Sequence, residues 1–271
     1  MSNEPSQSSA DPVGPVRLFS KMLEFAPAIG LFVAVLAVWE ASVWGFSVPA
    51  YLLPAPSEIA ETFWLHRNVL MENLAYTMVA ATLGFILGTL VAAALAILFL
   101  YSRSAERALF PWAITLKAIP ILAIAPLLTI WLGFGLAPKV AIAALACFFP
   151  TLVNTVKGLR TVDRQSLEFL AVIGATKGQT FRHARFYAAL PYVFAAAKVS
   201  SSIAVIGAIV AEFTGANLGI GTVIVTAGYQ QDAAMLFAAV AVSSVATVLM
   251  FYLVVAVEKF SLFWPEASMD A

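Results

Sequence analysis

Apolar stretches long enough to cross a lipid bilayer constrain this chain more than any other feature. They cover approximately residues 26–46, 74–100, 111–133, 138–158, 192–213 and 234–257. About 20 apolar residues in a helix span the roughly 30 Å hydrocarbon core of a bilayer. Lipid offers no partners for free backbone groups, so each span must be helical. With 62% hydrophobic and 11% charged residues, the sequence predicts an all-α membrane protein with six transmembrane helices.

The basic residues predict how these spans are oriented. With six spans and a cytoplasmic N-terminus, the Lys and Arg residues on the inner side number thirteen of 15, all except Arg67 and Lys139. Basic residues concentrate on the cytoplasmic side of membrane proteins. A five-span or seven-span chain would place one terminus on the opposite side. We therefore expect cytoplasmic tails at residues 1–25 and 259–271, on either side of a transmembrane domain at residues 26–258.

The longest interior segment that cannot lie in lipid runs from residue 163 to residue 191 and carries acidic and basic side chains. It reads as two short helices, at about residues 162–173 and 177–187, separated at Gly174. Glycine supplies the positive φ or the close backbone approach that a sharp turn between helices needs. Such a helix pair on the cytoplasmic side is suited to contact with a soluble partner. The alternative is an amphipathic loop that lies on the lipid headgroups.

The second and third spans carry features that bear on packing and on a passage. Gly84 and Gly88 have the spacing that lets helix backbones approach closely, with a partner helix in this chain or in another. In the third span, Pro120 and Pro126 each remove a backbone donor and predict a kink or a break. Irregular backbone at membrane depth is tolerated where protein or a water-filled cavity satisfies it. The third span is thus a candidate wall of a passage, or else a kinked packing helix.

Polar residues in the later spans extend the set of candidates for a translocation path. Asn154 lies on the inner half of the fourth span, Ser201 lies in a fifth span rich in Ala, Ser and Gly, and Glu212 lies at the mouth of the outer loop up to residue 232. Asn154 either serves a passage or forms hydrogen bonds across helices. Together with Pro120 and Pro126, these residues form the predicted path.

The outer end of the first span carries an acidic residue. Glu40 lies beside Trp44, which favours an interfacial acid held in an aromatic belt over a functional acid in the membrane. Three prolines between residues 49 and 56 exclude a helix in that stretch. We expect Ser57 to cap a short helix that follows them.

Motifs for cofactor chemistry are missing from the sequence. It has no G-x-x-x-x-G-K-[ST] phosphate-binding loop and no H-E-x-x-H, C-x-x-C or G-x-S-x-G motif. His66 and His183 fall on opposite sides of the membrane in the predicted topology, and Cys147 has no second cysteine to pair with. We therefore expect a non-enzymatic chain with no metal and no cofactor of its own. The net charge of zero indicates no nucleic-acid partner.

The polar segment resembles the cytoplasmic "EAA" loop of bacterial ABC importer permeases. The resemblance rests on Glu168, on Gly174 six residues later, and on Leu190-Pro191 at the entry to the next span. Phe169-Leu170 stands in place of the family's two alanines, and Phe186-Tyr187 stands where a first Leu-Pro is expected. A second Leu-Pro at the position of Leu190-Pro191 is common in the nitrate, sulfonate and taurine branch.

Other motifs follow in the order of the same branch. From the third span onward the chain has Ala-Ile-Pro, Trp-x-Gly-x-Gly, Phe-Phe-Pro, Gly-Leu-Arg-x-Val-Asp, the Glu…Gly loop, and Ala-Glu-Phe before Gly-x-Gly. The resemblance covers nearly the whole chain beyond about residue 26. It implies a type I ABC importer permease of MetI-like architecture in the bacterial inner membrane.

The resemblance also implies function and partners. A permease of this kind forms the translocation path for a small solute, here a nitrate-, sulfonate- or taurine-like anion or a related organic compound, by alternating access. Its partners are a second permease copy, a cytoplasmic ATPase dimer that holds the ATP, an outer solute-binding protein and the lipid bilayer. The coupling loop, residues 160–191, would contact the ATPase through Glu168, Gly174, Ala175, Phe181, Leu190 and Pro191. An autonomous channel or facilitator and a polytopic membrane enzyme are the alternatives, but the first leaves the polar loop unexplained and the second lacks clustered catalytic residues.

Overall fold

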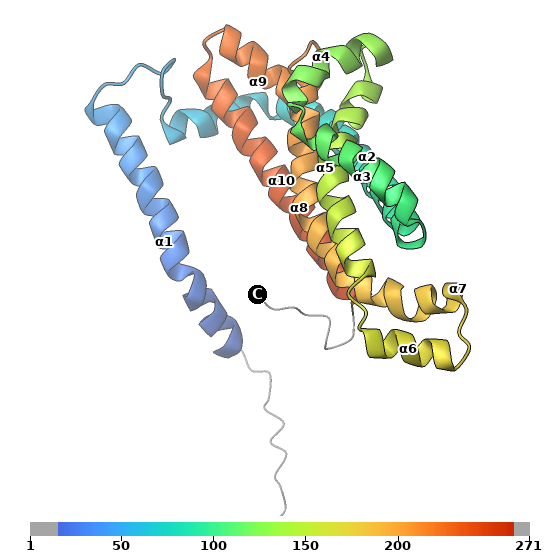
Figure 1. The fold of residues 1–271 in the computed structure, drawn as a ribbon. Coiled ribbons are helices and arrows are strands. Elements are labelled where there is room, and N and C mark those ends of the chain that lie inside the picture. The colour runs from blue at the N-terminus through green and yellow to red at the C-terminus, as the bar shows by residue number, and fades with distance from the viewer. Residues whose placement is uncertain (1–15, 263–271) are drawn as a thin grey trace, which may run out of the picture.

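A computed structural model describes the backbone of residues 16–262 and the side chains from residue 26 onward. The predicted tails, residues 1–25 and 259–271, therefore lie largely outside the described residues. The described chain is built from helices and the turns between them (Figure 1). They are α1 (Val16–Gly45), α2 (Pro56–Tyr101), α3 (Arg103–Ala118), α4 (Ile121–Leu132), α5 (Leu136–Leu159), α6 (Arg164–Val172), α7 (Lys177–Thr180), the π-helical turn η1 (Phe181–Arg185), α8 (Phe186–Glu212), α9 (Ile220–Tyr229) and α10 (Ala233–Ser261).

Within the described residues, five helices are long and apolar enough to cross a membrane, and the count rises to six if the bent pair α3 and α4 forms one broken span. This arrangement confirms the predicted all-α fold class. The two helices of the pair are bent by 102° relative to each other. The break lies at Pro120, the N-cap of α4, as the sequence predicts. At Pro126 the helix is not broken, because α4 continues through it, and a kink there stays a prediction.

The centre of the molecule is a tight packing of α2, α5 and α8 through small residues. A Cβ atom added to Gly88 of α2 would come within 2.5 Å of the Ala144 carbonyl oxygen of α5, and one added to Gly84 would overlap the Ala143 side chain. From the other side of α5, a Cβ on Gly207 of α8 would lie 3.0 Å from the Ala143 Cα. The partner of the two glycines in α2 is therefore α5 of the same chain.

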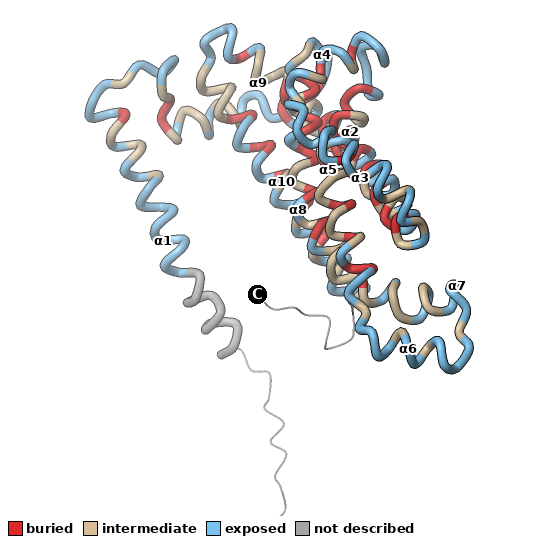
Figure 2. The backbone as a smooth tube through the Cα atoms, viewed as in Figure 1, coloured by how far each residue is buried: buried red, intermediate tan, exposed pale blue. Residues whose placement is uncertain are grey.

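Helix α1 stands apart from the other helices in Figure 1, and Figure 2 shows most of its described length as exposed. Its outer end is attached through Glu40, whose carboxylate accepts hydrogen bonds from the Ser57 hydroxyl at 2.7 Å and backbone N–H at 3.1 Å. The indole N–H of Trp44 donates to the same carboxylate at 2.8 Å. Glu40 is therefore held at the start of α2, where it satisfies a backbone N–H that a helix leaves free.

The start of α2 differs from the sequence-based expectation in two ways. The N-cap is Ala55, followed by Pro56 in the first helical position, so the cap lies two residues before Ser57. The carboxylate of Glu58 accepts a hydrogen bond from the Ala55 N–H at 3.1 Å. The helix is also not short, because it continues to Tyr101 after an interruption of the helical backbone at His66.

Candidate functional site

The helices of the coupling loop are capped by residues of the loop itself. Asp163 precedes α6, and its carboxylate accepts hydrogen bonds from the Ser166 hydroxyl and backbone N–H, each at 2.7 Å. These bonds, with the hydroxyl contributing most, lower the pKa of the Asp163 carboxyl. Thr176 and Gln179 cap α7 reciprocally, each side chain bonded to the other residue's backbone N–H. The first turns of both helices are thus capped by side chains of the loop itself.

Gly174 forms the corner between the two loop helices, as predicted. Its φ is +74°, in the left-handed region that favours glycine. The Gly174 N–H donates to the Ala171 carbonyl at 3.1 Å, and the Ala175 N–H donates to the Leu170 carbonyl at 2.9 Å, which together close the end of α6. A Cβ at position 174 would meet nothing within 4 Å. The backbone angle, not a close approach within this chain, is thus what requires glycine.

The second predicted loop helix, residues 177–187, is not a separate helix. Helix α7 runs through the π-helical turn η1 into α8, and Lys177–Glu212 forms one continuous helical segment. Leu190 and Pro191 therefore lie inside α8 and do not precede it. Phe181 packs inward, with its ring centroid 6.4 Å from that of Tyr101. Within this chain Phe181 anchors the loop to the end of α2.

The tip of the loop presents apolar residues that the described chain leaves uncovered. Phe169, Val172 and Ile173 are 64%, 85% and 60% exposed. Next to them, Glu168 forms an exposed ion pair with Arg164, with 2.6 Å between the charged groups. Contiguous exposed apolar residues on a capped, rigid helix are typical of a contact surface.

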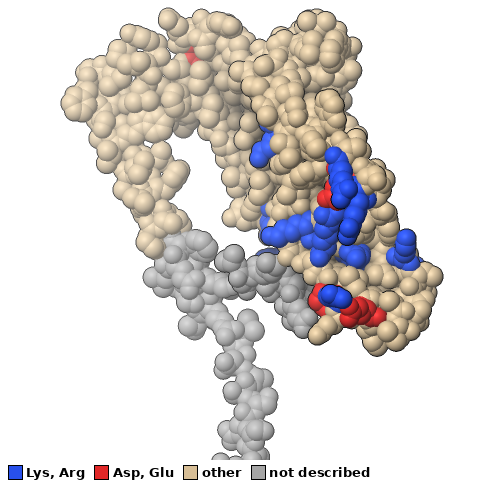
Figure 3. Space-filling view, in the orientation of Figure 1, with Lys and Arg blue, Asp and Glu red and all other residues tan. Residues whose placement is uncertain are grey.

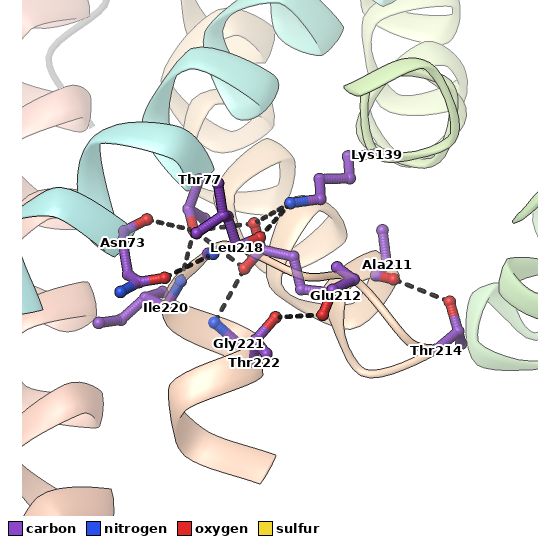
Figure 4. A network of polar contacts seen from close by, with 12 residues as sticks. Asn73, Thr77, Lys139, Ala211, Glu212, Thr214, Leu218, Ile220, Gly221 and Thr222 are labelled. Atoms are coloured by element: carbon purple, nitrogen blue, oxygen red, sulfur yellow. Dashed lines mark hydrogen bonds and ion pairs between the residues drawn. The ribbon is translucent and has the colours of Figure 1, made fainter. Parts of the chain in front are cut away.

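The opposite end of the molecule holds a buried polar network around Glu212 (Figure 4). Glu212 is the last residue of α8 and is 2% exposed. Its carboxylate pairs with the Lys139 ammonium of α5 at 3.2 Å and accepts hydrogen bonds from the Thr77 hydroxyl of α2 at 2.9 Å and the Gly221 N–H of α9 at 2.8 Å. The Thr77 hydroxyl in turn accepts a hydrogen bond from the Ile220 N–H at 2.8 Å.

The first turn of α9 completes this network. Its free backbone N–H groups face the Glu212 carboxylate and Thr77, an arrangement that the positive end of a helix favours. Asn73 accepts a hydrogen bond from the Gly219 N–H at 2.8 Å, and the Lys139 ammonium also donates to the Leu218 carbonyl. Gly219 has a φ of +129°, and a Cβ there would overlap the Glu212 carboxylate.

The network changes the interpretation of Glu212. The sequence suggests an acid at the mouth of an outer loop and on a passage, but the structure buries it where α2, α5, α8 and α9 meet. The expected loop up to residue 232 also contains a helix, α9. The sequence analysis missed Asn73, Thr77 and Lys139 as its partners. A lysine at the start of an apolar span was the available signal, because a charge there needs a counter-ion.

The remaining predicted path residues fall in different environments. Pro120 and Pro126 are exposed, at and beyond the bend between α3 and α4. Asn154 lines a cavity of about 440 Å³ between α3, α4 and α5, and its amide donates to the Pro150 carbonyl at 2.8 Å. Ser201 is fully buried, and its hydroxyl donates to the Lys198 carbonyl of the same helix. This burial in helix packing argues against the predicted place of Ser201 on a passage.

Comparison with known proteins identifies the family. Residues 84–261 match the family described as the inner membrane component of binding-protein-dependent transport systems. The chain belongs to this family. The permease is 35% identical over 247 residues to the riboflavin transport system permease protein RibX of Chloroflexus aurantiacus, covering 89% of the permease and 92% of that relative.

Further relatives agree with this assignment. The formylaminopyrimidine transport permease protein ThiX of Halalkalibacterium halodurans is 32% identical over 86% of the permease and 93% of its own length. The putative aliphatic sulfonates transport permease protein SsuC of Bacillus subtilis is 32% identical, with coverage of 78% and 77%. A solved structure of the MetNI methionine ABC transporter in an inward-facing conformation aligns with a TM-score of 0.59 at 19% identity, over 73% of the permease and 97% of that chain, which confirms the MetI-like fold.

These matches confirm the resemblance read from the sequence. The permease is a multi-pass membrane protein of the ABC importer class, whose members transport small solutes. Its family supplies the membrane component of the transporter and is not itself catalytic. Across residues 26–262, no group of three or more His, Cys, Asp or Glu side chains could hold a metal ion.

Proposed function

We propose that the permease imports a small solute by alternating access and is driven by an ATPase that docks on the coupling loop. The observation that carries this proposal is the tip formed by Phe169, Val172 and Ile173, which is apolar and exposed at the end of a helix capped by Asp163 of the same loop. Next to the tip, Gly174 sets the corner and Glu168 adds a charged group. A preformed surface of this kind can bind a soluble partner without an ordering cost.

The charge distribution supports a cytoplasmic position for this loop. In Figure 3, Lys and Arg side chains gather toward the end of the molecule that carries α6 and α7, and the opposite end shows none on this face. Such an excess favours the cytoplasmic side. The proposed location is the bacterial inner membrane, with both termini in the cytoplasm and with α9 and the Glu212 network toward the outer face.

The proposed assembly has two copies of the permease, an ATPase dimer that binds ATP, and a solute-binding protein at the outer face. The exposed bend at Pro120, together with the α3 and α4 surfaces beside it, is the face on which a second copy would close a passage. The solute is proposed to be a nitrate-, sulfonate- or taurine-like anion or a related small organic compound. Relatives named for sulfonate, riboflavin and formylaminopyrimidine transport support this range.

The decisive experiment is co-purification of the proposed ABC ATPase partner after co-expression, at equal membrane levels of permease variants. Gly174→Asp should insert normally but lose the ATPase and transport together, because it distorts the corner and places a charge at the contact surface. Gly174→Asn is the matched control, since Asn tolerates positive φ and adds no charge. Undiminished association of Gly174→Asp would refute docking on this loop. Solute flux through the permease reconstituted alone would support the autonomous facilitator instead.

A further inference from the structure

Lysines inside the apolar spans differ in how their charge is compensated. Lys139 pairs with Glu212 at 3.2 Å, and Lys198 pairs with Glu258 of α10 at 3.0 Å. Lys117 lies in the last turn of α3, three residues before the break at Pro120, and is exposed in the single chain. Among the described residues it has no carboxylate partner, and its ammonium lies 4.8 Å from the centroid of the Phe149 ring. An ionisable side chain within a membrane segment is rare and indicates a functional site.

Lys117 and Phe149 line the same cavity of about 440 Å³ as Asn154. Its other walls are almost entirely apolar and include Ile119 and Ile203. The volume is in the range of sites for small organic molecules. A lysine and an amide are therefore the polar groups that a solute in this cleft would meet, and both can donate hydrogen bonds.

We propose that this cleft holds the transported solute during passage and selects an organic anion. The anionic group would replace the Phe149 ring as the neighbour of the Lys117 ammonium, and the apolar or aromatic body would lie against the ring and the isoleucine side chains. A cation resting on an aromatic face is held without a counter-ion and stays available to an anion. This inference rests on the proposed import function and narrows its solute class.

The apolar walls disfavour a small inorganic anion such as nitrate. Such an ion carries its charge over its whole surface, and walls without donors cannot replace its hydration. An aryl or alkyl sulfonate or carboxylate has one end for Lys117 and a body that gains from leaving water. The cleft therefore fits the organic members of the proposed solute range.

The test uses the full chain in inner-membrane vesicles, with Asn154→Cys as a reporter in a Cys147→Ser background. The thiol at position 154 is allowed to react with an anionic and a cationic methanethiosulfonate reagent of similar size. Lys117→Gln should reduce the preference for the anionic reagent about tenfold, as expected for the loss of one nearby charge at reduced dielectric. Lys117→Arg is the matched control and should keep the preference.

A competition experiment defines the solute class without any change at Lys117. Benzenesulfonate should protect the thiol at position 154, whereas nitrate and the neutral benzamide at the same concentration should not. The inference would be overturned if the preference for the anionic reagent were the same in the chain with Lys117 and in the Lys117→Gln variant. It would also be overturned if nitrate and benzenesulfonate protected the thiol equally. Neither readout needs an ATPase, so a failure of the cleft is distinguishable from a failure of coupling at Gly174.

Discussion

The two ends of the permease hold their polar residues in opposite ways. At the Glu212 end, carboxylate, ammonium, hydroxyl and backbone groups are buried and join helices that are far apart in the sequence. At the Gly174 end, each cap lies within a few residues of the helix it serves, and apolar side chains are exposed. The first end is closed, so that changes there act on the fold. The second is open, so that changes there are expected to act on the proposed partner.

Removal of the buried acid should give the largest effect on stability. Glu212→Ala leaves Lys139 without a counter-ion and the Gly221 N–H without an acceptor, while the Thr77 hydroxyl keeps only the Asn73 carbonyl at 3.2 Å. We expect it to lower the free energy of unfolding by about 3–5 kcal/mol. The measurement is a denaturing-detergent titration of the purified permease. Glu258→Ala, which breaks the half-buried pair with Lys198, is the control and should cost less. If the free energy of unfolding fell equally in the two variants, the Glu212 network would not be the stronger contributor to the fold.

Alanine at Gly174 and at Gly219, two of the four positive-φ glycines among the described residues, separates the cost of the backbone angle from the cost of the surroundings. Gly219→Ala combines an unfavourable φ with overlap against the Glu212 carboxylate, so we expect a loss above about 3 kcal/mol. Gly174→Ala has the unfavourable φ but open space, so about 1 kcal/mol is expected. The same titration measures both. A larger cost at position 174 would show that the loop is more tightly held than its contacts indicate.

The smallest effect is expected at the exposed ion pair. Glu168→Ala removes its contact with Arg164, and exposed pairs contribute about 1 kcal/mol or less to stability. ATPase co-purification should fall, but less than with Gly174→Asp. An unfolding free energy lowered as much as by Glu212→Ala would contradict the local character of the loop.

Hydropathy and local turn chemistry account for what the sequence could predict. The apolar spans, the break at Pro120 and the corner at Gly174 each depend on residues close together in the chain. The cap of α2 was misplaced although Pro56 signals the first helical position. Helix α9 was missed because ten apolar residues after Gly219 are too few for a span and resemble a loop when a membrane topology is sought.

The contacts of the outer network could not be predicted from sequence spacing. Lys139 and Glu212 are 73 residues apart, and Thr77 is 135 residues from Glu212. Local patterns contain no information about such pairs, since they depend on how whole helices pack. The same limit applies to Ser201, where the polarity of the side chain suggested a passage but the helix face carrying it turned inward. It also applies to the glycines of α2, whose partner helix only the structure reveals.

The unbroken course of the chain from Lys177 to Glu212 has a mechanical consequence. Its 36 residues are helical throughout, although Figure 1 shows that α7 turns sharply away from the axis of α8, and they connect the coupling loop with the buried network. Because no unstructured linker separates α7 from α8, a displacement of the coupling loop is passed to α8 through helical backbone. The proposed contact surface and the Glu212 network are thus joined by one continuous helical segment.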